Sequence, residues 1–222
     1  ILTLLMSFYN RIDTVMIERM LEKGVGDVQS GIYAQAFRIL DATNMIAFLT
    51  AGMLLPIFSR MLKYKESVES LVKLISTLLL APAIVIGVSC FFYSKEFMDL
   101  IYKEHINESA AIFGLIMLSF VAVSTTYIFG TLLTANGNMK HLNIMAAFGM
   151  IVNVSLNLVL IPDLKAYGSA ISSLITQFLT AIIQVIIAQR IFKFKVNYRL
   201  INTFIMFTIG VISISYAAFR VL

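Results

Sequence analysis

Four charged side chains lie inside two strongly apolar runs of this sequence. Arg11 and Asp13 interrupt the run ILTLLMSFYNRIDTVMI, and Arg38 and Asp41 interrupt GIYAQAFRILDATNMIAFL. At the centre of a bilayer each such charge costs about 2.5–3.5 kcal/mol on insertion scales. A chain retains such groups where they pair, face water or bind something, and a guanidinium can bind phosphate or carboxylate oxygens through two parallel hydrogen bonds. We therefore take all four as candidate substrate-binding residues.

The positions of these charges limit how they can pair. If the two runs form an antiparallel helical hairpin with its turn at 21–30, Asp13 and Arg38 lie at one depth, and so do Arg11 and Asp41. Arg11 and Asp13 are separated by roughly 160° around a helix, so both pairs cannot form at once in an undistorted helix. The spacing predicts one structural pair and one charge that faces a cavity. A salt bridge that only locks the hairpin and a substrate role for an arginine both remain open.

The composition predicts an all-α membrane protein. Of 222 residues, 59% are hydrophobic and only 13% are charged, and the mean hydropathy is +0.90. Soluble domains carry about 25% charged residues. About seven stretches are long and apolar enough to cross a bilayer as helices. They span 1–19, 31–59, 69–92, 109–134, 140–161, 167–189 and 200–219.

The charges divide by side of the predicted membrane. Loops that would lie on one side carry nine basic and two acidic residues, and loops on the other side carry six basic and eight acidic residues. Because short loops rich in Lys and Arg stay in the cytoplasm, we expect the loop near 20–30 to face outward. The excess of basic residues is therefore no sign of nucleic-acid binding. It suits anionic membrane lipids as partners.

Enzyme chemistry finds little support in the sequence. His105 and His141 fall in loops on opposite sides of the predicted membrane, and no catalytic, cofactor or metal-binding motif is present. We expect no catalytic residues, no cofactor and no metal centre. A membrane-embedded transferase and a non-transporting scaffold are the alternatives from other classes. The absence of a catalytic cluster argues against the transferase, and the intramembrane charges argue against a passive scaffold.

Small residues mark close helix packing in the later part of the chain. Gly168, Ser172, Thr176 and Thr180 recur at intervals of four, which predicts a seam where a second helix approaches closely. Asn153 and Asn157 repeat this interval in the preceding segment. The segment around 94–104 has an amphipathic pattern and predicts a short helix in the membrane interface.

Two stretches carry a resemblance to a known family. NRIDTVMI followed by IYAQAFRI and LLPIFSR resembles the first two helices of the C-terminal lobe of polysaccharide (O-antigen-type) flippases. TANGNMK followed by NVSLNLVLIPDLKAYGSAISSL resembles a later signature of the same family. These proteins belong to the multidrug/oligosaccharidyl-lipid/polysaccharide exporter superfamily. The resemblance covers nearly the whole chain. Lys165 departs from it, because a turn glycine is expected after Ile-Pro.

The resemblance implies the C-terminal lobe of a two-lobed, MATE-like transporter. Residues 1–192 would form a six-helix lobe and 193–222 an additional membrane helix, and an N-terminal lobe of the same chain would accompany them. Such a protein would flip polyprenyl-pyrophosphate-linked oligosaccharide across the bacterial inner membrane. Arg38 would be the first candidate for the pyrophosphate, and Gln35 and Asn44 would be candidates for the sugars. A cation-coupled multidrug exporter of the same superfamily is the alternative, and use of a coupling cation is left open.

Overall fold

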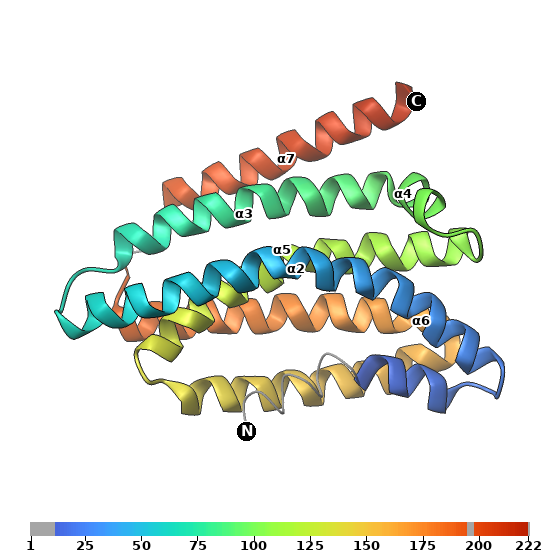
Figure 1. Cartoon of the computed structure of the whole chain (residues 1–222), viewed down its shortest axis with the longest axis horizontal. Helices are drawn as coiled ribbons and strands as arrows, with labels where there is room; N and C mark the ends of the chain where they lie inside the picture. Colours follow the sequence, from blue (N-terminus) through green and yellow to red (C-terminus); the bar gives the residue numbers. More distant parts are fainter. Residues whose placement is uncertain (1–11, 195–197, 222) are drawn as a thin grey trace.

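The computed structural model describes residues 12–194 and 198–221, and within these ranges the chain is helical and contains no strand. Residues 12–20 form a helical segment that precedes the labelled helices (Figure 1). The labelled helices are α2 (Val25–Lys63), α3 (Glu69–Phe92), α4 (Ser94–Ile101), α5 (Ile106–Ala135), α6 (Met139–Phe192) and α7 (Tyr198–Val221). Five of them, all except α4, are long and apolar enough to span a membrane. The chain is a multi-pass membrane protein.

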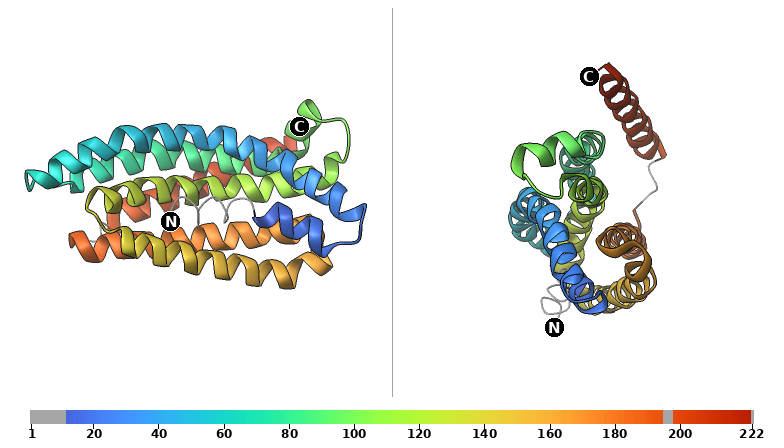
Figure 2. Two further views of the ribbon diagram at one scale, coloured as in Figure 1. Left: turned by 60° about the horizontal axis from the view of Figure 1, so that its bottom comes forward. Right: turned by 90° about the vertical axis from the view of Figure 1, so that its right-hand side faces the viewer.

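The long helices run up and down the bundle, nearly parallel to one another (Figures 1 and 2). α5 lies at the centre, where it packs against α2, α3, α4 and α6. Its apolar residues are buried on several sides, and Phe113, Met117 and Phe120 form part of the main core. A helix that is apolar all round is expected at such a central position. The flanking helices α2, α3, α4 and α6 therefore share one core, which is built around α5.

α6 contains 54 residues, which is too long for one crossing, and it folds back on itself. Its two arms, about 139–161 and 166–192, run antiparallel side by side (Figures 1 and 2). The reversal follows Pro162 and is completed at Lys165, which has φ 54° and ψ −135°. Glycine is the residue that usually adopts this positive-φ conformation, and here the lysine adopts it instead. The N–H of Ala166 donates to Gln29 Oε1 at 3.3 Å and helps to hold it.

The predicted spans correspond closely to the described helices. The segments 140–161 and 167–189, expected as separate helices, match the two arms of α6, which are separated by the non-helical backbone at Lys165. Most of the expected span 1–19 falls outside the described residues. Pro56 and Pro82 lie inside α2 and α3 and end neither helix. The count of seven spans and the two-lobed arrangement remain predictions.

Two helices lie at the edge of the bundle. α4 is the short amphipathic helix expected near 94–104; it buries Met98 and leaves Leu100 84% exposed. α7 contacts α3 through aromatic side chains, with Phe92 against Tyr216 and Phe219. Most of its surface is exposed, as expected for a helix that faces lipid.

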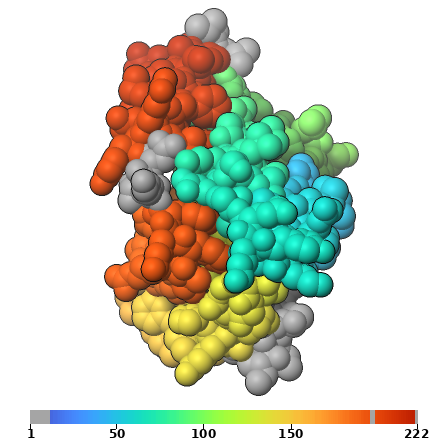
Figure 3. Space-filling model, turned by 90° about the vertical axis from the view of Figure 1, so that its left-hand side faces the viewer, coloured from blue at the N-terminus to red at the C-terminus, as the bar shows by residue number. Residues whose placement is uncertain are grey.

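Basic residues gather at one end of the bundle. The junctions 64–68 and 136–138 and the end of α6 lie at this end, and the junctions 21–24, 102–105 and 163–165 lie at the other (Figure 1). Figure 3 shows the basic end face on, with the junction between α2 and α3 beside the end of α6. The fold therefore groups the loops by charge as the sequence predicted.

Candidate functional site

A buried carboxylate, that of Asp13, holds together four helical segments. The Asp13 side chain is 1% exposed. Its Oδ2 accepts hydrogen bonds from Tyr33 Oη at 2.8 Å and from Ser173 Oγ, and its Oδ1 accepts one from Asn157 Nδ2 at 2.6 Å. Asn157 Nδ2 also donates to Asn153 Oδ1 at 3.1 Å. We call these five residues the Asp13 cluster.

The members of the Asp13 cluster come from distant parts of the sequence. Tyr33 projects from α2, Asn153 and Asn157 from the first arm of α6, and Ser173 from its second arm. The reversal of α6 at Lys165 places both arms within reach of the helical segment 12–20. Since donors from α2 and from both arms of α6 meet the one carboxylate, the cluster fixes the relative depth of these segments.

Of the two ion pairs that the sequence left open, the pair between Asp13 and Arg38 is not formed. Both residues are described, and no salt bridge joins them; the carboxylate is taken up by hydroxyl and amide donors. Arg38 lies exposed on α2. Tyr33, which bonds Asp13, and Arg38 are five residues apart on α2 and thus about 140° apart around the helix, so Arg38 points away from Asp13. Arg11 and any pair that it makes lie outside the described residues.

A second feature is a cavity of about 380 Å³ between α2, α5 and both arms of α6. Asp41 and Asn44 line it from α2, while Gln35 and Arg38 do not contribute to its wall. Arg38 and Asp41 were expected to share a face. They are about 60° apart around the helix, which is enough to place one at the cavity and the other outside it.

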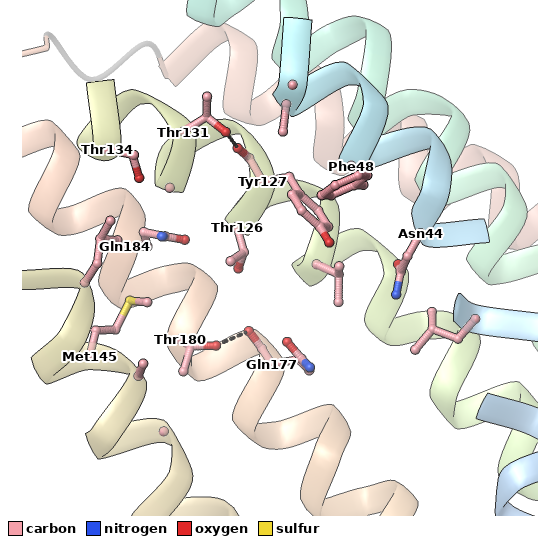
Figure 4. Close-up of a pocket in the computed structure, with 18 of the residues that line it drawn as sticks. Asn44, Phe48, Thr126, Tyr127, Thr131, Thr134, Met145, Gln177, Thr180 and Gln184 are labelled. Carbon is pink, nitrogen blue, oxygen red and sulfur yellow. Dashed lines mark hydrogen bonds between the residues drawn. The ribbon is translucent and has the colours of Figure 1, made fainter. Parts of the chain in front are cut away.

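The wall of the cavity combines apolar and uncharged polar side chains. Figure 4 shows Asn44 and Phe48 on α2, Thr126 and Tyr127 on α5, and Gln184 on the second arm of α6 around one space. The rings of Phe48 and Tyr127 meet edge to face at 6.3 Å. The other polar residues of the wall are Asp41, Thr131, Thr134, Gln177 and Thr180.

Some of these polar groups form hydrogen bonds within their own helix, and others have no partner in the described part of the chain. The hydroxyls of Thr131 and Thr180 donate to the carbonyls of Tyr127 and Thr176, as threonines in helices commonly do. In contrast, Asn44 Oδ1, Thr126 Oγ1 and both amide atoms of Gln184 are buried and have no hydrogen-bond partner among the described residues. A volume of 380 Å³ lies within the usual range of ligand pockets.

The predicted seam of small residues is buried. Ser172 and Thr176 are 0% exposed and Thr180 is 7% exposed, so this side of the second arm faces protein. The seam prediction is confirmed, but it missed Ser173, the neighbour that bonds Asp13. Gln184, eight residues after Thr176 and four after Thr180, continues the same face and was also missed. The interval of four could have revealed it.

Sequence reasoning thus found Asp13, Asp41 and Asn44 but not most of their neighbours. Tyr33, Thr126 and Tyr127 carry no signal in an apolar run, because tyrosine and threonine are common in membrane helices. Among the described residues, no group of three or more His, Cys, Asp or Glu side chains could hold a metal ion. No protein-family model, curated protein or solved structure matches this chain. The Asp13 cluster and the cavity are therefore the features of this chain that bear on its function.

Proposed function

We propose that this chain forms one lobe of a transporter that flips polyprenyl-pyrophosphate-linked oligosaccharide across the bacterial inner membrane for surface polysaccharide biosynthesis. The observation that supports this is the cavity between α2, α5 and α6, whose wall carries polar side chains in the middle of apolar membrane helices. A bundle that served only as a scaffold would gain stability by filling this space with apolar side chains. A transporter needs a polar space to carry a hydrophilic headgroup past the lipid.

In this proposal an N-terminal lobe of similar size supplies the opposite wall, and the two lobes rock about the cargo in a two-lobed, MATE-like arrangement. Arg38 is exposed on α2, one face away from the cavity, so it can meet an anionic group on that side. Its planar guanidinium suits the oxygens of a pyrophosphate. The glycan would then lie beside the cavity and the pyrophosphate beside Arg38.

Reconstitution of the full-length protein tests the proposal. Liposomes that contain the protein and a fluorescent polyprenyl-pyrophosphate oligosaccharide should show headgroup movement to the opposite leaflet. Arg38→Ala should abolish it, and Arg38→Lys should restore it only in part, because the ammonium keeps the charge and loses the fork geometry. Arg19→Ala, at another exposed arginine, is the matched control and should flip normally. Absence of flipping by the wild-type protein would refute the proposal.

The Asp13 cluster favours a second candidate, a cation-coupled exporter of small molecules. It offers the buried carboxylate of Asp13 and the Oδ1 of Asn157, which has no partner among the described residues. Oxygens of these kinds are the ligands that hard cations prefer. If transport of a cationic dye depends on a sodium or proton gradient, and Asp13→Asn removes this dependence, the exporter is favoured. Gradient-driven dye transport that is unaffected by Asp13→Asn would count against it.

A further inference from the structure

The buried polar atoms around the cavity point to what it binds. Gln184 is 0% exposed, and neither its Oε1 nor its Nε2 has a hydrogen-bond partner among the described residues. Figure 4 shows its amide directed from the second arm of α6 toward the space that Thr126 and Tyr127 also face. Thr126 Oγ1 on α5 and Asn44 Oδ1 on α2 are likewise buried and have no hydrogen-bond partner among the described residues. Unpaired donors and acceptors thus surround one cavity from three helices.

Such groups cost stability unless something outside the chain pairs with them. An apolar side chain of similar shape at position 184 would avoid this cost, so the glutamine has no evident benefit for folding. An amide has both a donor and an acceptor, and it pairs well with hydroxyl and acetamido groups. The arrangement is that of a binding site for an uncharged, hydrogen-bonding ligand.

The charges of the described wall residues disfavour a phosphate group as the ligand of this cavity. Among the described lining residues none is a lysine or an arginine, and the one charged side chain is the acidic Asp41. A phosphate is bound through cationic or backbone N–H donors, and the described wall residues supply no cationic side chain. The cavity therefore suits a neutral group and not the anionic part of a lipid-linked cargo.

The backbone opposite Gln184 leaves room for this amide. A Cβ added at Gly130 of α5 would lie 2.8 Å from Gln184 Nε2, closer than real contacts allow. With glycine at this position the amide can extend past α5 into the cavity. Gly52, which also lines the cavity, has nothing within 4 Å of such a Cβ, so the close fit distinguishes Gly130 from Gly52.

We propose that this cavity binds the neutral, hydroxyl- and acetamido-bearing sugar portion of the cargo, and that the Gln184 amide is its principal hydrogen-bonding group, with Thr126 and Asn44 completing the contacts. The assignment of the bound group to a cargo rests on the proposed function. The binding chemistry itself rests on the unpaired atoms, on described wall residues that include no lysine or arginine, and on the space beside Gly130.

Protection from alkylation measures this binding directly. In the full-length protein in lipid nanodiscs, Cys90→Ser removes the native thiol of the described chain and Thr134→Cys places a reporter in the cavity wall. The alkylation rate with N-ethylmaleimide is then measured with free N-acetylglucosamine or with glucose 1-phosphate. We expect N-acetylglucosamine to slow the reaction at least threefold and glucose 1-phosphate to have less effect.

Adding Gln184→Met should abolish the protection, while the unfolding temperature should stay the same or rise because an unpaired amide has been removed. Gln189→Met is the matched control: it lies on the same helix outside the cavity wall, and protection should persist. The proposal is overturned if N-acetylglucosamine gives no protection, if glucose 1-phosphate protects equally, or if Gln184→Met retains protection. A lower unfolding temperature in Gln184→Met would also overturn it, since the amide would then have a structural partner.

The two proposals can fail separately, and the results distinguish them. If the sugar protects the reporter and Gln184→Met removes this protection, but liposomes show no flipping of the lipid-linked oligosaccharide, the binding site stands and the flippase proposal falls.

Discussion

Two polar regions of this bundle differ in where their hydrogen bonds go. In the Asp13 cluster the buried carboxylate accepts hydrogen bonds from Tyr33, Asn157 and Ser173. In the cavity, Asn44, Thr126 and Gln184 keep buried atoms without a partner among the described residues, and about 380 Å³ lies between them. Both regions sit among apolar helices, where an unpaired polar atom is costly.

This difference separates polar groups that stabilise the fold from polar groups that are available to bind a ligand. A polar group whose partners all come from the chain fixes the helices that carry those partners, and its removal leaves several donors unsatisfied. A polar group without such partners contributes little to the fold and is available to a ligand. Substitutions in the Asp13 cluster should therefore act mainly on stability, and substitutions in the cavity mainly on binding.

The largest effect is expected for Asp13→Ala. The change removes the carboxylate that accepts from Tyr33, Asn157 and Ser173, and each buried hydrogen bond to a charged group that is lost costs about 1–3 kcal/mol. We expect a loss of at least about 3 kcal/mol in unfolding free energy and a strong fall in folded protein, measured by thermal unfolding and size-exclusion chromatography. Asp163→Ala, at the exposed turn of α6, should behave like the wild type. Wild-type stability in Asp13→Ala would show that the cluster does not hold the helices.

The next effect concerns the packing beside the Asp13 cluster. Ser172 and Thr176 are fully buried on the second arm of α6. Replacing either with Leu should overpack the interface and cost about 1–3 kcal/mol, seen as lower abundance and a lower unfolding temperature. Ile175→Leu, at a position 45% exposed on the same arm, is the control and should be neutral. Normal abundance of both leucine variants would mean that this face can separate without loss.

A smaller effect is expected for Arg38→Ala, which tests whether Arg38 belongs to the Asp13 cluster. Because Arg38 is exposed and does not bond Asp13, its removal should change stability by less than about 0.5 kcal/mol. The double variant Asp13→Ala with Arg38→Ala should be as unstable as Asp13→Ala alone, within about 0.5 kcal/mol. Recovery of stability in the double variant would instead indicate a buried ion pair between them. Denaturant titration of the four proteins decides between these outcomes.

The smallest effect on stability is expected at the cavity. Alanine in place of a helix-interior glycine gains up to about 1 kcal/mol in helix propensity. At Gly130 this gain should be offset, since the new methyl group must displace the Gln184 amide, whereas Gly52→Ala should keep it. We expect near-wild-type stability for Gly130→Ala and a slightly higher unfolding temperature for Gly52→Ala. Equal stabilisation in both variants would show that Gln184 moves aside freely and that Gly130 does not determine its position.

Long-range features of the fold follow from patterns that persist over many residues. Apolar stretches of membrane-spanning length predicted α2, α3, α5 and α7 near their observed bounds, and charge counts grouped the loops by end of the bundle. The short helix α4 was recognised from its amphipathic pattern. The two arms of α6 were predicted as separate spans, and the reversal between them is completed at Lys165, where the family resemblance gave reason to expect a glycine.

The sequence by itself determined that this is an all-helical membrane protein, and it marked Asp13, Asp41 and Asn44 as costly residues in apolar helices. Only the tertiary structure decided which of them are satisfied by the chain. Asp13 meets Tyr33 and Ser173 across 20 and 160 residues of sequence, and Gln184 faces Gly130 across the cavity. The physical reason is that a hydrogen bond depends on a side chain's rotation about its helix and on which helix lies opposite. A hydropathy pattern gives depth in the membrane, but three-dimensional packing alone sets these partners.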